Sequence, residues 1–289
     1  MARQDYGDWL KGLYGMRVQK LNVNAGFSCP NRDGTLAHGG CSYCNNSSFT
    51  PAFGVASRSV TQQLADGKDF YAGKYAHMKY LAYFQSFTGT YASISRLREL
   101  YIEALDVDDV VGLVVSTRPD CIADDVLDLL CCINEHYRVI VELGVETTHD
   151  VTLQRINRCH SWQCARDAIL RVAKRGLKVG AHMILGLPGE SLSDMMTSAN
   201  AIAQLPLDTV KFHQLQVLKG TELAQQWNRG ELQLQHWSAT EYAAFCHQVI
   251  SILPQHIVIE RMVSTAPRHL LLYPQWGLKP HQFNALFTT

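Results

Sequence analysis

Residues 18–44, VQKLNVNAGFSCPNRDGTLAHGGCSYC, join a strand pattern to a loop with three cysteines. Residues 18–25 have the composition of a β-strand that ends just before the loop. Cys41 follows Cys29 after a long gap, and Cys44 completes a close CxxC pair. Thiolates bind soft metals, and a structural metal site normally uses four protein ligands. Three cysteines therefore predict a metal centre with one open position, where chemistry can occur.

Strand and helix patterns alternate along the chain beyond this loop. We expect strands at 79–85, 110–117, 138–146, 177–190 (including a following loop) and 208–218, and helices at 59–75, 93–105, 123–136, 161–176 and 191–205. The strands are apolar on both faces, which is typical of a parallel sheet covered by helices. Six strands in series predict an α/β fold, a partial (β/α)6 barrel of the TIM type. Its active site would lie at the C-terminal ends of the strands, where the cysteine loop begins.

The pattern changes after residue 218. We expect residues 1–218 to form the barrel core and 219–289 to form a C-terminal extension packed on the barrel. Within the extension, 238–253 predicts an amphipathic helix and 256–261 a last strand. The tail at 266–287 is apolar and aromatic, so it is expected either to pack on the barrel or to cover the site.

Composition narrows the class of protein. The 289 residues are 47% hydrophobic and 18% charged with zero net charge, which argues against disorder and against general attraction to nucleic acid. The two ends of the chain are mildly basic around an acidic middle. We find no signal-peptide pattern and no apolar run of membrane-spanning length, so we expect a cytoplasmic protein without a membrane partner. In that compartment, nine cysteines favour metal ligands and buried thiols over disulfides.

The cysteine loop alone leaves several kinds of site open. His38 could complete a Cys3His zinc site, and Cys41 with Cys44 could form a redox pair that leaves Cys29 unused. A [4Fe–4S] cluster normally uses four cysteines, and three would leave one iron free for a substrate or cofactor. Four other cysteines lack ligand spacing and are expected to be small buried apolar residues: Cys121, Cys131, Cys132 and Cys246.

Motifs along nearly the whole chain resemble one family. Three cysteines after the first barrel strand, with the aromatic Tyr43 before the last, resemble the radical S-adenosylmethionine (radical SAM) superfamily. The long gap between the first two cysteines is similar to the subgroup related to the Elongator catalytic subunit. Within that subgroup the chain resembles the YhcC-like bacterial family, through YFQSFTGTYA, STRPDC, VELGVET, INRCH, GAHMILGLPGE and VKFHQLQVLKGTEL in the same order.

The resemblance implies a cofactor set and a reaction. Cys29, Cys41 and Cys44 would hold a [4Fe–4S] cluster whose fourth iron binds SAM. An electron from a flavodoxin- or ferredoxin-like donor would cleave SAM to a 5′-deoxyadenosyl radical, which abstracts hydrogen from the substrate. Kinship with the Elongator subunit implies a tRNA base, with the wobble uridine as the expected target. The alternatives are a radical SAM enzyme acting on a small metabolite, or a zinc-stabilised interaction protein.

The same resemblance suggests residues that contact SAM. Ile184 and Gly186 would pack against the adenine. Gln85 and Thr88 stand where many relatives carry an acid for the SAM amino group. Glu142, an acid within an apolar strand, is expected to contact the ribose or amino group of SAM.

Three further expectations concern single residues. The structural alternative for Glu142 is an ion pair with a barrel arginine such as Arg118. Gln214 and His213 on the sixth strand would lie near the adenine, with His213 a catalytic candidate or a satisfied core residue. Cys159 is either a hydrogen-atom donor near the site or an incidental thiol.

Overall fold

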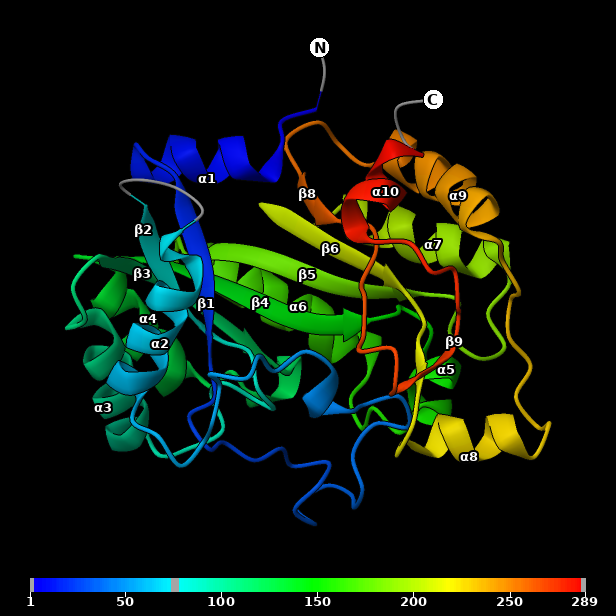
Figure 1. Ribbon diagram of the computed structural model, residues 1–289, viewed down its shortest axis with the longest axis horizontal. Coiled ribbons are helices and arrows are strands. Elements are labelled where there is room, and N and C mark those ends of the chain that lie inside the picture. Colours follow the sequence, from blue (N-terminus) through cyan, green and yellow to red (C-terminus); the bar gives the residue numbers. More distant parts are fainter. Residues whose placement is uncertain (1–2, 74–77, 287–289) are drawn as a thin grey trace.

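A computed structural model describes residues 3–73 and 78–286. Within these ranges, seven parallel strands form one sheet in the order β1-β2-β3-β4-β5-β6-β8, and β7 pairs with β9 in a small second sheet. The strands are β1 (Val18–Val23), β2 (Lys79–Phe84), β3 (Val110–Thr117), β4 (Arg138–Glu146), β5 (Lys178–Leu185), β6 (Thr209–Gln214), β7 (Val217–Leu218), β8 (Val258–Arg261) and β9 (Leu271–Tyr273). The sheet curves into the predicted partial barrel (Figure 1).

Helices connect successive strands and pack on the outer face of the sheet, as Figure 1 shows for α2, α3, α4 and α6. The helices are α1 (Tyr6–Tyr14), α2 (Val60–Ala72), α3 (Ile94–Leu105), α4 (Asp124–Asn134), α5 (Asp150–Arg155), α6 (Trp162–Lys174), α7 (Leu192–Ala203), α8 (Glu222–Asn228), α9 (Ala239–Ile252) and α10 (Pro280–Ala285). Serines begin five of them, because each serine side chain accepts a hydrogen bond from a first-turn backbone N–H: Ser59, Ser93, Ser161, Ser191 and Ser238.

The six expected strands and the last strand are present, with one difference. The segment 208–218 is two strands, because the chain leaves the sheet after Gln214 and β7 pairs antiparallel with β9 instead. The end of the helix predicted at 59–75 lies outside the described residues. The short helices α1, α5, α8 and α10 were not predicted, because fewer than three turns give too little periodicity. None of the described helices is long and apolar enough to cross a membrane.

The N-terminal segment joins the two edges of the open barrel. Arg3 donates hydrogen bonds to the carbonyl oxygens of Pro254 and Ile257 at 2.8 and 2.6 Å, and Asp5 forms a parallel bridge with Ile259 beside β8. The helix α1 that follows packs against both β1 and β8. Its aromatic side chains fill the N-terminal end of the barrel interior, against Leu81, Tyr83, Val114 and Ile140.

Charged residues occupy the middle of the barrel interior. Lys20 on β1 contacts Glu142 on β4 at 2.5 Å and Glu260 on β8 at 2.8 Å. Lys211 on β6 contacts the same two carboxylates at 2.7 and 3.3 Å, and the Tyr83 hydroxyl donates to Glu142 at 2.6 Å. We call these five residues the interior ion network. It separates the apolar end of the barrel from the cavity at the C-terminal ends of the strands.

The C-terminal tail packs on the barrel, and the residues just before it border the cavity. Trp276 and Phe283 stack at 5.8 Å and lie against Tyr242 of α9. Thr265, just before the tail, lines the cavity. The tail therefore packs on α9 as one alternative expected, and the alternative that the tail itself covers the site stays a prediction.

Candidate functional site

The cysteine loop is folded back on itself by backbone hydrogen bonds. The Gly40 N–H donates to Asn31 O at 2.8 Å, and the Cys44 N–H donates to Cys41 O at 2.9 Å. Gly40 has φ 90°, and a Cβ there would lie 2.9 Å from Nε of Arg32, so only glycine fits this close passage. This fold brings the three cysteines onto the wall of one cavity despite the long gap between the first two.

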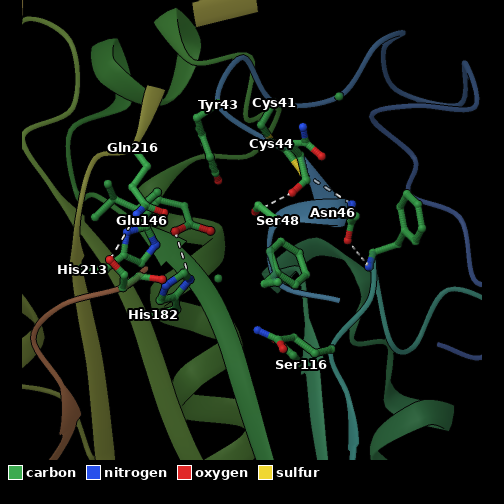
Figure 2. Close-up of a pocket in the computed structure, with 18 of the residues that line it drawn as sticks. Cys41, Tyr43, Cys44, Asn46, Ser48, Ser116, Glu146, His182, His213 and Gln216 are labelled. Atoms are coloured by element: carbon green, nitrogen blue, oxygen red, sulfur yellow. Dashed lines mark hydrogen bonds and ion pairs between the residues drawn. The ribbon is translucent and has the colours of Figure 1, made fainter. Parts of the chain in front are cut away.

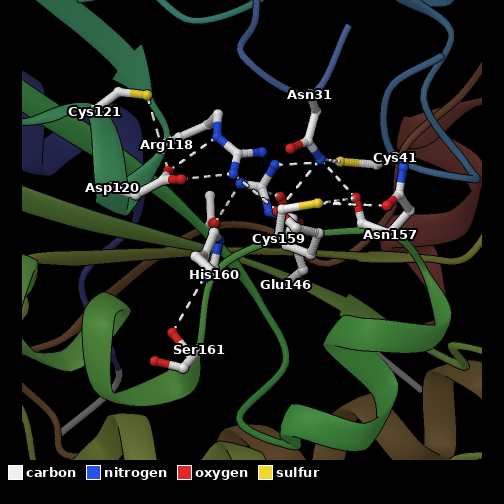
Figure 3. Close-up of polar contacts among 12 residues, drawn as sticks. Asn31, Cys41, Arg118, Asp120, Cys121, Glu146, Asn157, Cys159, His160 and Ser161 are labelled. Atoms are coloured by element: carbon white, nitrogen blue, oxygen red, sulfur yellow. Dashed lines mark hydrogen bonds and ion pairs between the residues drawn. The ribbon is translucent and has the colours of Figure 1, made fainter. Parts of the chain in front are cut away.

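A segment after α5 anchors the loop from the other side. The Ser42 N–H donates to Ile156 O at 2.9 Å, and the Asn157 amide donates to Gly40 O at 2.9 Å. The Asn31 amide donates in turn to Asn157 O at 2.6 Å (Figure 3). The INRCH motif therefore contributes a support for the cysteine loop.

Nitrogen donors face two of the three sulfurs. Asn31 Nδ2 and Arg158 Nη1 each lie 3.5 Å from Cys41 Sγ. Asn46 Nδ2 lies 3.6 Å from Cys44 Sγ. Donors of this kind stabilise sulfur in its thiolate form and tune the reduction potential of a bound cluster. The donor set fits a thiolate-bound metal group.

The cavity lies at the C-terminal ends of the strands. Figure 2 shows the cysteine loop on one side and Glu146, His182 and His213 on the other. The floor and walls also include residues from the ends of β2 to β6: Gln85, Thr88, Ser116, Arg118, Gly144, Ile184 and Leu215. This is the rim where the barrel fold places its chemistry.

Among the described residues that line this cavity, Glu146 is the one with an acidic side chain. It ends β4 in a bulge, has φ 68° and is 4% exposed. Burial raises the pKa of Glu146 above its ordinary value, although Arg158, with Nη2 3.3 Å from Oε1, opposes the change. A left-handed backbone at a buried acid is costly and is found at functional sites. We therefore regard Glu146 as a functional residue of the cavity.

Two histidines lie together beside Glu146. The rings of His182 and His213 are 4.7 Å apart, and His182 Nδ1 is 3.4 Å from Glu146 Oε2. Burial and then Arg261 lower the pKa of His213 to about 3. Burial and then His213 lower the pKa of His182 well below its ordinary value. Both rings are therefore neutral at pH 7.

The low pKa of His213 predicts a loss of stability in mild acid. The unfolded chain takes up a proton near pH 6.5 and the folded chain only near pH 3, so stability falls as pH drops through this window. We expect His213 to account for about 1–2 kcal/mol of the loss between pH 7 and pH 5, allowing for its partial contact with the cavity. Urea unfolding at both pH values should show a smaller loss in His213→Gln. An equal loss would contradict the assignment.

Several buried polar atoms around the cavity have no hydrogen-bond partner among the described residues. They are Thr88 Oγ1, Arg118 Nη1, Glu146 Oε2, Arg158 Nε and His182 Nε2. Buried polar groups are normally paired, so unpaired ones at a cavity indicate contact with bound water, an ion or a ligand. These side chains offer a positive charge, a negative charge and neutral hydrogen-bonding groups. Together they suit a ligand that carries both charges and hydroxyl groups.

Comparison with known proteins identifies the chain. A family model described as "Radical SAM superfamily" matches residues 29–202, and one described as "Radical_SAM C-terminal domain" matches residues 207–287. YhcC of Escherichia coli (strain K12) is 39% identical over 272 residues, which cover 94% of this chain and 86% of YhcC. The chain belongs to the radical SAM superfamily, in its YhcC-like family. It is therefore a radical SAM enzyme, and membership implies a [4Fe–4S] cluster and SAM.

Two more distant proteins are similar to this radical SAM chain, one in part of its sequence and the other in its fold. A tRNA uridine(34) acetyltransferase of Methanocaldococcus infernus is 28% identical over 166 residues, covering 56% of this chain and 30% of that protein. The structure of M. infernus Elp3 with its N-terminus deleted (1–46) superposes with a TM-score of 0.69 at 20% identity. It covers 94% of this chain and 62% of that one. The second similarity supports the partial-barrel fold.

The radical SAM cavity includes only some of the residues expected from the sequence. Gln85, Thr88, Ile184 and His213 line it. Asn22 Nδ2 donates to Gln85 Oε1 at 2.6 Å. The contacts of these four residues with SAM remain predictions.

Four other expected residues do not line this cavity. Glu142 belongs to the interior ion network. The alternative ion pair with Arg118 was wrong, because Arg118 pairs with Asp120 at 2.8 Å. The remaining three have other neighbours: Gly186 faces the Trp237 ring, Gln214 donates to Ser264 O, and Cys159 is exposed in a shallow pocket with Asn157 and His160.

The four cysteines that were expected to be buried differ in solvent exposure. Cys246 is buried in the core as expected, whereas Cys132 is exposed and Cys121 and Cys131 are half-buried. The expectation of burial was therefore wrong for Cys132. Helical periodicity was the missing signal, because Cys132 falls on the solvent face of α4 between the buried Leu129, Leu130 and Ile133.

Sequence reasoning missed Glu146 and Arg158, although both lie in quoted motifs. Glu146 is the second acid of VELGVET and stands at the end of its strand, where the barrel places functional groups. Arg158 is the arginine of INRCH. Its guanidinium donates to Gly144 O at 2.6 Å, and a Cβ on Gly144 would lie 2.5 Å from it. The glycine within β4 was a signal for this close approach.

Proposed function

We propose that this radical SAM enzyme holds its cluster through Cys29, Cys41 and Cys44 and abstracts hydrogen from a tRNA base, the wobble uridine. One observation carries the proposal: three cysteines on a hydrogen-bonded loop line one cavity with unpaired polar atoms. The cysteines stand at the C-terminal ends of parallel strands, where catalytic groups of barrels gather.

The donors around the loop suit a cluster held by three thiolates. Asn31 and Arg158 approach Cys41, and Asn46 approaches Cys44, so positive or polar N–H groups offset thiolate charge. Zinc at a Cys3His site is less well supported. His38 lies at the exposed tip of the loop against Gly34 and does not line the cavity.

When bound, the cluster and SAM supply a 5′-deoxyadenosyl radical after one electron arrives from a flavodoxin- or ferredoxin-like donor. The chain's own residues position SAM and protect the cavity. We propose that Arg118 and Glu146, with their unpaired atoms, bind the charged end and hydroxyls of SAM, and that Thr88 adds a hydrogen bond. Ile184 and Leu215 give an apolar wall that excludes water near the reacting atoms.

Two observations favour a tRNA substrate. A relative that aligns with 56% of this chain is named a tRNA uridine(34) acetyltransferase. Arginines also border the cavity: Arg118 pairs with Asp120 and Arg158 with Glu146, whereas Arg32 and Arg261 form no ion pair among the described residues. A polyanion is attracted to such a wall. A small anionic metabolite is the second candidate, favoured by the same charge.

The test is formation of 5′-deoxyadenosine by anaerobically reconstituted protein given SAM and dithionite. We expect a basal rate that rises about tenfold or more with unmodified tRNA, because substrate-dependent closure commits SAM to cleavage. The control is the same tRNA already modified at the wobble uridine, which should not stimulate. Stimulation by a cell metabolite fraction, and not by tRNA, would replace the tRNA assignment with the small-metabolite one.

A further inference from the structure

A second cavity adjoins the first on the side of the C-terminal tail. It has a volume of about 560 Å³ and lies between the ends of β6 and β8 and the segment 263–283. In Figure 1 this tail passes beside the C-terminal ends of the strands before it returns to α10. Cavities of about 300–1,000 Å³ hold small-molecule ligands. The residues proposed to hold the cluster and SAM line the first cavity and leave this second one without an assigned ligand.

Three residues line both cavities: Gln216, Ser264 and Thr265. They form a partition held by side-chain amides. Gln214 Nε2 and Gln216 Nε2 donate to Ser264 O at 2.8 and 3.1 Å, and Gln214 Oε1 accepts from the Ser264 N–H at 3.1 Å. A ligand seated in the second cavity therefore has its near end at the wall of the first.

The second cavity is cationic and contains no acid among its described lining residues. Arg268 and Lys279 supply the charge, and both side chains are exposed. No ion pair involves either of them within the described part of the chain. An arginine and a lysine without acidic neighbours favour an anion, and phosphate is the group that both bind well.

The cavity is also lined by apolar and aromatic residues: Leu271, Pro274, Trp276 and Leu278. Trp276 is held in place, because its Nε1 donates to Trp237 O at 2.8 Å and Phe283 stacks on its ring. Because Phe283 stacks on Trp276 and Tyr242 lies 5.2 Å from it, the ring surface left at the cavity is an apolar contact for a planar base rather than a free stacking face.

We propose that the second cavity binds a nucleotide of the substrate, with the phosphate at Arg268 and Lys279 and the base against Trp276. This inference rests on the proposed function in one respect only: the partition at Gln216 places the reacting nucleotide, or its neighbour, beside the first cavity. The same chemistry suits a free nucleotide and a nucleotide within an RNA chain.

The test measures binding by calorimetry to the reconstituted protein without reductant. The probes are uridine 5′-monophosphate, uridine and an unmodified tRNA. We expect the charge reversal Arg268→Glu/Lys279→Glu to weaken binding of the monophosphate or the tRNA at least about tenfold, since two phosphate contacts are lost. Uridine lacks phosphate, so its binding should be weaker and insensitive to these changes. Binding of the tRNA alone identifies RNA as the source, and binding of the monophosphate alone identifies a free nucleotide.

The matched control is Arg98→Glu/Lys174→Glu, which reverses two exposed charges on α3 and α6 away from both cavities. Equal weakening in this control, or none in Arg268→Glu/Lys279→Glu, overturns the proposal. So does loss of S-adenosylhomocysteine binding in place of nucleotide binding, which would make the second cavity part of the SAM site. Because binding needs no turnover, a protein that binds nucleotide but forms no 5′-deoxyadenosine refutes the proposed function and leaves this inference standing.

Discussion

Alanine at Cys29, Cys41 or Cys44 is expected to prevent assembly of a [4Fe–4S] cluster, and 5′-deoxyadenosine formation should fall by more than about 100-fold. The three thiolates would hold the cluster together, so the two that remain in each variant are not expected to retain it. The three cysteines are the ones that share the cavity wall, whereas Cys121 and Cys159 do not line it.

The measurement is iron and sulfide content after anaerobic reconstitution, with the electron paramagnetic resonance spectrum of the reduced protein. Cys121→Ala and Cys159→Ala are matched controls, because both thiols lie beside Asp120 or Asn157 near the same rim. These two variants should keep a full cluster. A full cluster in Cys41→Ala, or its loss in Cys159→Ala, would show that the ligand set is wrong. Slower turnover with an intact cluster in Cys159→Ala would support its candidate role as a hydrogen-atom donor.

The barrel could be predicted because its signals are local and repeated. Each core strand carries several buried apolar residues in a row, as in Val139–Val141, and five of the longer helices have a serine cap. The short helix α1 has a side-chain cap at Asp5, but its nine residues are too few to show a clear repeat. Its place is set by contacts with residues more than two hundred positions away, such as Arg3 with Ile257, which no local pattern encodes.

The site was harder to predict than the fold, and the two acids of β4 illustrate why. Glu142 and Glu146 lie on one strand, and only Glu142 was predicted from the sequence to meet SAM. Their positions along the barrel axis separate their roles. Glu146 stands at the C-terminal end of β4 beside the cavity, whereas Glu142 lies further inside the barrel, where Lys20 and Lys211 contact it. Cross-strand neighbours decide this, so the pairing of Glu142 with lysines on β1 and β6 could not be read from β4 alone.

Replacing Glu142 by glutamine is expected to destabilise the protein by about 3–5 kcal/mol, a large part of the stability of a typical domain. Glu142 accepts from Lys20, Lys211 and Tyr83, and its side chain is 6% exposed. Burial raises the pKa of Glu142, but the two lysines outweigh burial and hold this pKa well below its ordinary value. Removing its charge leaves two buried ammonium groups facing Glu260 alone.

The matched control is Glu99→Gln, which makes the same chemical change in an exposed pair. Glu99 contacts Arg96 at 3.0 Å, and their side chains are 64% and 55% exposed, so we expect a change below about 1 kcal/mol. Unfolding by urea at pH 7 compares the two variants. If Glu142→Gln does not fold, a second comparison still tests whether an unpaired buried cation causes the destabilisation. The double variant Glu142→Leu/Lys211→Met is compared with Glu142→Leu alone. Removing a second charge from the network should then restore stability relative to Glu142→Leu, because the destabilisation comes from an unpaired buried cation and not from lost packing. Equal effects of Glu142→Gln and Glu99→Gln would mean that water reaches the barrel interior and that the network is not desolvated.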